Sequence, residues 1–497
     1  FKCHEKRCSF KLLLRSNAND IFQLIEERPH DCLCELPTIK RLWARERIAE
    51  VFEDDPRIKP KDLKERFREK YDVDVDISLL TNALLDVKKA FSFDNQAFGL
   101  LSSFLTALEK ENEGTTTCVQ SQDGIFQRAF LFPGMCSRAF YHTPKIVGLD
   151  ACHIKARYGG VMMVMTLLDG NGSIFPAAVG IAESEKTETW SWFLHQVEAA
   201  LHIPDGGDGV VFLSDREKGI ETSIKEVFPQ ACQGFCVFHI QKNVKRAHHT
   251  SLDGLLFKAA KAATVKEFEE KLALMKALDD EAAAYIAEID KAKWARAFFP
   301  VRRLGHVTSN IAESMNRWLE EARWHDPVGL FSIYVLKLNN LFEKRRDKYA
   351  SLSSHALPKR VAQLYDNSVK KSRKLILRRH TKKNIFQVRA RGEMMKKRWK
   401  IVDLDNMSCT CGFYREYEIP CQHMCAVLLS LRDETPSRLI HRERLRDALL
   451  ATYDGVTIPV DLDGLTSDEM KPPVGMKSVE GPSRSESLLR RRKSQRG

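Results

Sequence analysis

The stretch that most constrains the fold runs from Lys145 to Gln196 and alternates apolar segments with turn residues. Three apolar runs, at 146–149, 161–168 and 174–181, have the length and composition of buried strands. Asp-Gly-Asn-Gly at 169–172 separates the last two runs and favours a hairpin, because Gly and Asn tolerate positive φ. An amphipathic helix follows this stretch, so we expect an α/β fold.

Acidic residues interrupt or follow two of the strands, and a third acid lies near the start of a helix. Asp150 lies in the first strand, where a buried carboxylate is unfavourable without a partner, and a metal ion is one candidate. Asp215 ends a short apolar strand, at the edge where open α/β sheets place their chemistry. Each acid also has an ordinary structural alternative, Asp150 as a turn cap and Asp215 as a helix N-cap. Glu313 stands three residues after Asn310, which is the offset of a helix capping box.

The charge of the chain restricts the partners that it can have. Its 497 residues carry a formal net charge of +12, which favours a polyanionic partner, most simply nucleic acid. A hydrophobic content of 43% over this length supports more than one domain. No apolar run is long enough to span a membrane, and no signal peptide is evident. We therefore expect a nucleic-acid-binding protein of several domains with no membrane partner.

Cysteine and histidine form a compact group near the end of the chain. The 13 cysteines are an odd number and several lie beside histidines, which favours reduced thiols and metal sites over disulfides. One group has the spacing Cys-x-Cys-x9-Cys-x-His and precedes an apolar helix expected over 424–431. Four soft ligands in two close pairs are typical of a structural zinc site. The predicted zinc ligands are Cys409, Cys411, Cys421 and His423.

A looser group of possible zinc ligands lies at the start of the chain. Two ligand pairs flank residues of hairpin character, which suits tetrahedral zinc, although Cys34 could compete and a scatter of free cysteines is the alternative. The chain begins at Phe1 without Met, so we expect this finger to be truncated at its start. The predicted ligands are Cys3, Cys8, His30 and Cys32.

The residues between this group and the α/β stretch have helical periodicity. Helices are expected over 38–51, 60–71 and 78–90, with prolines separating the first two. Short basic helices of this kind could form a helix-turn-helix DNA reader. They could equally form a solvated helical spacer, and the sequence does not decide between the two.

Three later segments are defined by their composition. Residues 240–300 are rich in Ala and Lys with helical periodicity, which predicts a helical insertion within the α/β domain. Residues 369–400 are strongly basic, and aromatic residues at Phe386 and Trp399 favour a phosphate-binding surface over an ordinary solvated face. The predicted DNA contacts there are Arg378, Arg379, Lys382 and Lys383. The end of the chain is rich in Pro, Gly, Ser and charge, which predicts disorder, and 490–493 resemble a nuclear localisation patch.

Several segments closely resemble the transposases of Mutator-like elements (MULE). They are GLDACHIKARYGGVMMVMTLLDGNGSIFPAAVGIAESE, FLSDREKGIETSIKEVFPQA, CVFHIQKNV and TSNIAESMNRWLEEAR. The segment SCTCGFYREYEIPCQHMCAVL resembles the SWIM zinc finger of these proteins, and HDC at 30–32 is similar to their WRKY/GCM-type finger. The resemblance is collinear over most of residues 1–430. The expected order of strands and helices, with acids on the first strand, the fourth strand and the last helix, is that of an RNase H-like fold.

The resemblance implies a DDE catalytic triad at Asp150, Asp215 and Glu313. Three carboxylates of this kind hold two Mg²⁺ or Mn²⁺ ions for DNA cleavage and strand transfer. Cys236 and His239 match a CxxH motif of the family, which we expect to position DNA rather than to bind zinc. The implied partners are double-stranded DNA, as terminal inverted repeats and target, and further copies of the chain on that DNA, in the nucleus.

The resemblance also implies a domain order and leaves other functions open. The alternatives are a domesticated relative, such as the far-red-response transcription factors that bind DNA without cutting it, and, more remotely, a structural SWIM module. The expected domains are a zinc finger (1–36), a helical region (37–112), the RNase H-like domain (113–345, with the insertion 240–300), a basic linker of helix and strand (346–400), the SWIM finger (401–435) and a largely disordered basic tail (436–497).

Overall fold

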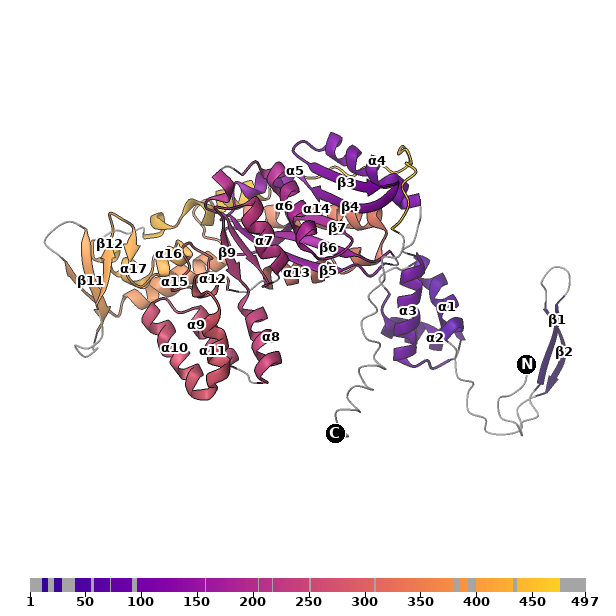
Figure 1. Cartoon of the computed structure of the whole chain (residues 1–497), viewed down its shortest axis with the longest axis horizontal. Coiled ribbons are helices and arrows are strands. Elements are labelled where there is room, and N and C mark those ends of the chain that lie inside the picture. The colour runs from indigo at the N-terminus through magenta and orange to yellow at the C-terminus, as the bar shows by residue number, and fades with distance from the viewer. Residues whose placement is uncertain are drawn as a thin grey trace. The chain divides into compact units, whose positions relative to one another are not determined.

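The computed structural model divides the chain into two compact units, residues 1–91 and 92–497 (Figure 1). The structure describes residues 11–16, 22–28, 41–54, 58–71, 73–91, 96–156, 158–203, 205–216, 218–249, 252–307, 310–379, 384–391, 399–431 and 436–473. In this part of the chain, no helix is long and apolar enough to cross a membrane.

The first unit contains a hairpin and three helices. Strands β1 (Lys11–Ser16) and β2 (Phe22–Arg28) pair antiparallel, as expected between the two predicted ligand pairs. Cys3, Cys8, His30 and Cys32 lie outside the described residues. The three expected helices are present as α1 (Arg41–Asp54), α2 (Pro60–Tyr71) and α3 (Ile77–Phe91). They share an apolar core in which Trp43, Phe67 and Tyr71 meet edge to face.

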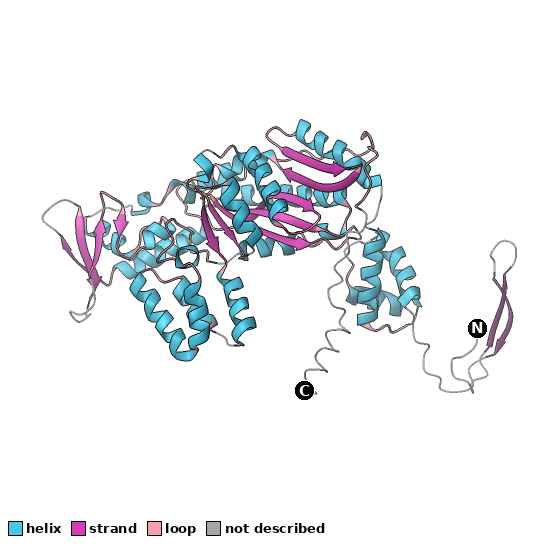
Figure 2. Cartoon of the chain, in the orientation of Figure 1, coloured by secondary structure: helices cyan, strands magenta, loops and turns pink. Residues whose placement is uncertain are grey.

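The second unit is built around a seven-stranded mixed sheet (Figure 2). Strands β5, β6 and β7 form an antiparallel meander, β8 and β9 extend it in parallel with β5, and the hairpin β3–β4 extends the other edge. The three strands predicted from the apolar runs are therefore confirmed. In spatial order, the strands are β3 (Thr116–Gln122), β4 (Ile125–Phe132), β7 (Ile174–Ala182), β6 (Val161–Leu168), β5 (Ile146–His153), β8 (Val211–Ser214) and β9 (Cys232–Phe235).

Helices cover both faces of this sheet. Gly180 of β7 faces α6 (Thr187–Leu201), because a Cβ added there would lie 2.9 Å from the Phe193 ring. Val179, the residue before Gly180, pairs with Val164 of β6, which in turn pairs with Asp150 of β5, so Val179 and Asp150 share a face of the sheet. Asp150 contacts α13 (Asn310–Trp318) on that face. Because successive side chains alternate between faces, α6 and α13 lie on opposite faces. The remaining helices around the sheet are α4 (Gln96–Glu111), α5 (Gly134–Phe140), α7 (Lys218–Val227) and α14 (Pro327–Ala350).

The expected helical insertion is present and has a core of its own. It comprises α8 (Val237–His248), α9 (Asp253–Ala260), α10 (Val265–Leu278), α11 (Asp280–Glu288) and α12 (Lys291–Trp294). Its buried residues, among them Phe268 and Trp294, form a cluster separate from that of the main sheet. Thr264 and Asp279 cap the starts of α10 and α11 by accepting backbone hydrogen bonds, which fixes where each helix begins.

A second sheet and its helices lie towards the end of the chain. Strands β10 (Leu375–Arg379), β11 (Ile385–Ala390), β12 (Lys400–Asp403) and β13 (Ser408–Cys409) form a four-stranded antiparallel sheet. Helices α15 (Lys359–Ser372), α16 (Phe413–Tyr417) and α17 (Gln422–Ser430) accompany it. One face of the sheet packs on α17 through Phe386, Val388 and Val402, all at most 2% exposed.

The end of the chain is ordered further than its composition predicted. Helix α18 (Arg446–Thr452) and the residues up to 473 pack on the main sheet. The hydroxyl of Tyr453, which is fully buried, donates to the Asp169 carboxylate at 2.7 Å, at the β6–β7 turn. Residue 471 forms a β-bridge with Ile125. The expectation of disorder from 436 onward was therefore wrong for 436–473, where contacts distant in the sequence hold polar segments in place, while 474–497 lie outside the described residues.

Candidate functional site

Asp150 and Asp215 lie at the same level on neighbouring parallel strands. β5 and β8 pair in parallel with Gly148 opposite Leu213. Asp150 and Asp215 each lie two residues beyond this pair, at the carboxyl end of β8. Both residues are only partly exposed. The register thus brings together two acids that are 65 positions apart in the sequence, as expected from their places at the ends of the strands.

Helix α13 is attached to β5 at this level. The Asn316 side chain donates from Nδ2 to Asp150 Oδ2 at 2.7 Å. Glu313 lies on α13 one turn before Asn316, and the structure describes its backbone but not its side chain. The Asn316 contact therefore attaches α13, the helix that contains Glu313, to β5. This contact was not predicted from the sequence, where Asn316 was only one of several polar residues near Glu313.

Asn316 also offers an unused oxygen beside the Asp150 carboxylate. Asn316 is 9% exposed, and its Oδ1 atom is buried without a hydrogen-bond partner among the described residues. Buried polar atoms are nearly always paired with protein, water or an ion, so this oxygen is available to such a partner. Carboxylate and amide oxygens are the ligands that Mg²⁺ and Mn²⁺ accept. The residues present therefore fit a divalent cation of this kind.

Cys236 and His239 are positioned at the same end of the sheet. The Cys236 N–H donates to the Ser214 carbonyl at 2.9 Å, and the Val237 N–H donates to the Val307 carbonyl at 2.9 Å. These bonds join the end of β8, the start of α8 and the segment that leads into α13. Cys236 is 1% exposed, whereas His239 is half-buried. A DNA contact by this pair would therefore come through His239, with Cys236 fixing the start of α8.

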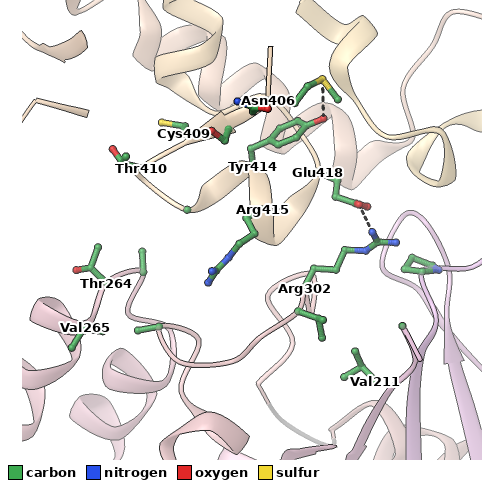
Figure 3. Close-up of a pocket in the computed structure, with 18 residues that line it drawn as sticks. Val211, Thr264, Val265, Arg302, Asn406, Cys409, Thr410, Tyr414, Arg415 and Glu418 are labelled. Atoms are coloured by element: carbon green, nitrogen blue, oxygen red, sulfur yellow. Dashed lines mark hydrogen bonds and ion pairs between the residues drawn. The ribbon is translucent and has the colours of Figure 1, made fainter. Parts of the chain in front are cut away.

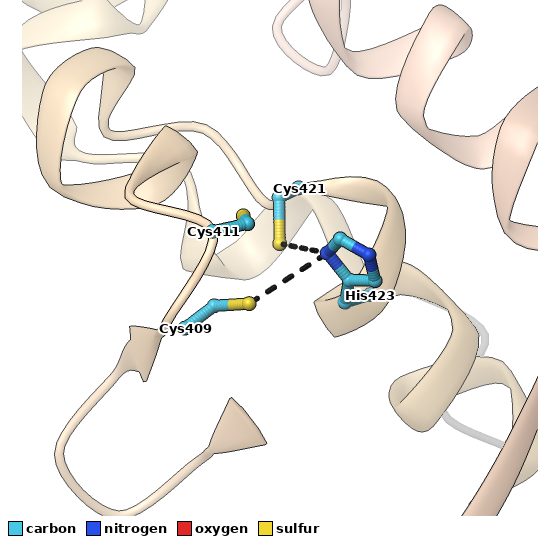
Figure 4. Close-up of side chains that lie close together, drawn as sticks. All are labelled: Cys409, Cys411, Cys421 and His423. Carbon is cyan, nitrogen blue, oxygen red and sulfur yellow. Dashed lines mark hydrogen bonds between the residues drawn. The ribbon is translucent and has the colours of Figure 1, made fainter. Parts of the chain in front are cut away.

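The four predicted ligands of the second zinc finger lie together (Figure 4). His423 Nδ1 lies 3.7 Å from Cys409 Sγ and 3.8 Å from Cys421 Sγ, and all four ligand atoms lie within 4.8 Å of one another. A tetrahedral zinc with Zn–S near 2.3 Å and Zn–N near 2.0 Å separates its ligands by roughly 3.5–3.8 Å. The pKa of the Cys411 thiol lies well below its usual range, chiefly because of its hydrogen bond with Cys409. The geometry fits one structural zinc.

Buried ion pairs attach this finger to the α/β domain. Glu416 of α16 accepts a hydrogen bond from the Gly305 N–H at 2.6 Å and lies 3.7 Å from Arg296. Arg302 pairs with Glu418 and also with Glu443, the latter at 2.8 Å. Burial raises the pKa of Glu418 above its usual value, and Arg302 opposes that shift. These contacts connect the zinc-finger segment to residues 296–305.

A pocket of about 960 Å³ lies where this finger meets the insertion and the main sheet (Figure 3). Arg415 points into it, and Arg302 on its wall pairs with Glu418. Val211 lines the pocket and is the first residue of β8, whereas Asp215 follows the last. The pocket therefore lies at the other end of this strand from the predicted catalytic acids, and Cys409 is the one predicted site residue that lines it.

The basic strands β10 and β11 present an arginine–tryptophan group. The guanidinium carbons of Arg378 and Arg389 lie 4.9 and 4.6 Å from the Trp399 ring centroid. Arg379, the next residue, lies 5.8 Å from the ring of Phe386, which belongs to the buried face. Arg378 and Arg379, both predicted DNA contacts, thus lie on opposite faces of the four-stranded sheet. Arg389 was not among the predicted DNA contacts. Lys382 and Lys383 lie outside the described residues.

The second unit combines a mixed α/β domain with a Cys/His group that has the geometry of a zinc finger. Residues 146–243 match the family model of the MULE transposase domain, and residues 401–432 match that of the SWIM zinc finger. The chain thus matches a Mutator-like transposase that carries a SWIM finger, as predicted. The first match contains Asp150, Asp215, Cys236 and His239, and Glu313 lies beyond it. A comparison with curated proteins gave no significant match.

Proposed function

We propose that the chain is the DNA transposase of a Mutator-like element, with Asp150, Asp215 and Glu313 as its catalytic acids. The observation that carries this proposal is the Asn316–Asp150 hydrogen bond, because it joins α13, the helix that contains Glu313, to the strand that carries Asp150. The order of the five central strands, β7-β6-β5-β8-β9, supports an RNase H-like domain. The matched MULE domain supports DNA as the substrate.

In this proposal the three carboxylates and the Asn316 oxygen hold Mg²⁺ or Mn²⁺ at the carboxyl end of the strands. Bound ions of this kind supply activation of the attacking oxygen and stabilisation of the leaving oxygen of a phosphodiester. Asn316 fixes the orientation of Asp150, and the attachment of α8 to the end of β8 sets the position of His239 beside the substrate. Water as the attacking group frees a 3′-hydroxyl at the transposon end, and that hydroxyl then joins target DNA. The protein forms no covalent bond to DNA in either step.

The other parts of the chain have supporting roles in the same proposal. The SWIM finger holds one structural zinc, and the basic sheet face around Arg378 binds DNA phosphates. The first finger (Cys3, Cys8, His30 and Cys32) takes part in binding the terminal inverted repeats. Several copies assemble on DNA to hold both transposon ends, and the basic residues 490–493 direct the protein to the nucleus.

Cleavage of a terminal-repeat duplex by the full chain tests the proposed function. The wild-type protein is expected to cut with Mg²⁺ or Mn²⁺ and not with Ca²⁺, whose coordination is looser. Asp215→Ala should lower the rate of cutting by at least about a hundredfold while leaving DNA binding intact, because this carboxylate is proposed to hold the metal ions. Asp208→Ala, which removes an exposed acid before the other end of β8, is the matched control and should cut normally. A wild-type protein that binds repeats and never cuts them would favour a transcriptional regulator instead.

A further inference from the structure

Helix α8 is a basic amphipathic helix whose start lies at the candidate catalytic site. Its sequence, VFHIQKNVKRAH, contains no acidic residue. Val237, Ile240 and Val244 are at most 1% exposed and pack into the core of the insertion. Lys242 and Arg246 are exposed and lie one turn apart. The helix therefore has one face fixed in the protein and one cationic face that points outward.

The outward face begins next to the strand ends. The backbone bonds of Cys236 to Ser214 and of Val237 to Val307 hold the first turn of α8 against the segments that carry Asp215 and lead to α13. Phe238, Lys242 and Arg246 then follow at intervals of four residues, and Lys242 Nζ lies 4.8 Å from the Phe238 ring. This stripe is about 12 Å long at 1.5 Å per residue. That length is the axial rise of about three to four nucleotides in one strand of a duplex.

The positive charge of this stripe is not neutralised within the described part of the protein. Lys245, at the side of the stripe, pairs with Asp253 of α9 at 2.8 Å. Among the described residues, no carboxylate lies within ion-pair distance of Lys242 or Arg246. The insertion has other exposed lysines, but those on α10 are opposed by acids one turn away, as Lys266 is by Glu270 and Lys276 by Asp280. The stripe on α8 is therefore a better anion-binding surface than α10.

We infer that the outward face of α8 binds the phosphate backbone of duplex DNA as it leaves the catalytic acids. This inference rests on the proposed function, because it takes the strand ends to be the place where a phosphodiester is cut. Lys242 and Arg246 contact successive phosphates. The Phe238 ring packs against the Lys242 ammonium group and keeps that side chain on the DNA-facing side of the helix. The apolar core of the insertion holds α8 in place as a DNA-binding helix. The backbone bonds of its first turn fix the distance between the stripe and the phosphate that is cut.

The test compares two charge-matched double variants of the full chain. Lys242→Ala/Arg246→Ala removes the stripe, and Lys266→Ala/Lys276→Ala removes two positive charges from another helix of the same insertion. Affinity for a duplex is measured against salt concentration in Ca²⁺, so that cutting does not interfere. The stripe variant should bind at least about tenfold more weakly near 0.15 M salt, with a log–log slope shallower by about two units, and the control should match wild type.

Each outcome of this comparison decides the inference. Binding by the stripe variant equal to wild type overturns it, and so does an equal weakening in the control variant, which would indicate a general charge effect. A preference of the wild-type chain for duplex RNA over duplex DNA also overturns it. Cutting in Mn²⁺ is measured separately. If the wild-type chain binds DNA through the stripe but never cuts it, the catalytic assignment is refuted. If the wild-type chain cuts DNA and the stripe variant binds DNA as tightly as wild type, the role of α8 is refuted.

Discussion

Asn316 combines two features that rarely occur together in a buried amide. Its nitrogen bonds Asp150, and its oxygen has no partner among the described residues although it is buried. Cation binding by this oxygen would explain both features, because the nitrogen then orients Asp150 and the oxygen is left for the ion. Asn316→Ala should then raise the Mn²⁺ concentration needed for half-maximal cleavage by about tenfold or more, as removal of an outer or direct ligand usually does. Thermal unfolding without metal controls for misfolding, and an unchanged metal dependence would assign Asn316 to packing alone.

His306 provides a second test at the scale of one residue. Burial, together with nearby arginines, lowers the pKa of His306 to about 4. A histidine with a pKa below its unfolded value of about 6.5 binds a proton more readily when unfolded, so its contribution to stability is present above pH 6.5 and is lost as the pH falls towards 4. The free energy of unfolding should fall by about 3 kcal/mol over this range. His306→Gln should flatten this dependence; an identical pH profile would show that His306 is not the titrating group.

The residue scale also shows where the sequence was informative. Asp150 and Asp215 were predicted because an acid in or after an apolar strand is unusual and needs a reason. The hydrogen bond of Asn316 and the stacking of Arg389 on Trp399 were not predicted. Both depend on the register between elements far apart in the chain, which local spacing does not contain.

At the scale of elements, the SWIM finger should depend on its metal. Cys421→Ser is expected to remove one equivalent of zinc from the full chain, because a structural zinc is held by four ligands and its binding supplies folding free energy. The variant should also unfold at a lower temperature, since Glu416 and Glu418 lose their fixed positions against Arg296 and Arg302. Cys425→Ser is the control: Cys425 is buried and donates to the Pro420 carbonyl rather than facing the ligands. Unchanged zinc content in Cys421→Ser would refute the assignment.

The strands β10 and β11 support a separate prediction about DNA affinity. Replacement of Arg378, Arg379, Lys382 and Lys383 by Ala should weaken binding to all DNA sequences, because phosphate contacts carry no sequence information. The log–log salt dependence should become shallower by about one unit for each phosphate that the variant no longer binds. Arg378→Ala alone should have the larger effect of the two arginines, since Arg379 lies over the buried-face residue Phe386. Weakening confined to one DNA sequence would point to base readout instead.

Elements with strong periodicity were predictable, and elements held by distant contacts were not. The runs that form β5, β6 and β7 are apolar enough to be identified locally, and all eight residues of β6 are buried. Strand β3, with sequence TTCVQSQ, is partly or fully exposed throughout and gives no such pattern. The same holds for α18, whose place depends on Tyr453 reaching Asp169. Polar, surface-facing elements acquire their conformation from partners that only the folded chain supplies.

At the scale of the whole molecule, charged contacts connect the α/β sheet, the helical insertion and the zinc-finger segment of the second unit. Arg302 links the segment before α13 to the finger through Glu418, and to the segment before α18 through Glu443. Arg216, next to Asp215, donates a hydrogen bond to Tyr285 of the insertion at 3.2 Å. The linker 346–400, which was expected to contain helix and strand, includes α15, and this helix packs beside α17. Arg302 lies on the pocket at the other end of β8 from Asp215, so damage to the finger should affect that end of the sheet first.

The central claim is that the Asp215 carboxylate contacts a catalytic metal ion, and a change of metal preference tests it most directly. Asp215→Cys replaces a hard oxygen with a soft sulfur, which binds Mg²⁺ poorly and accepts softer ions. Cleavage of a terminal-repeat duplex should disappear in Mg²⁺ and be partly restored in Mn²⁺ or Cd²⁺, while Asp215→Ala stays inactive in all three. Wild-type levels of cleavage in Mg²⁺ by either variant, or no cleavage by the wild-type chain in Mn²⁺, would contradict the claim.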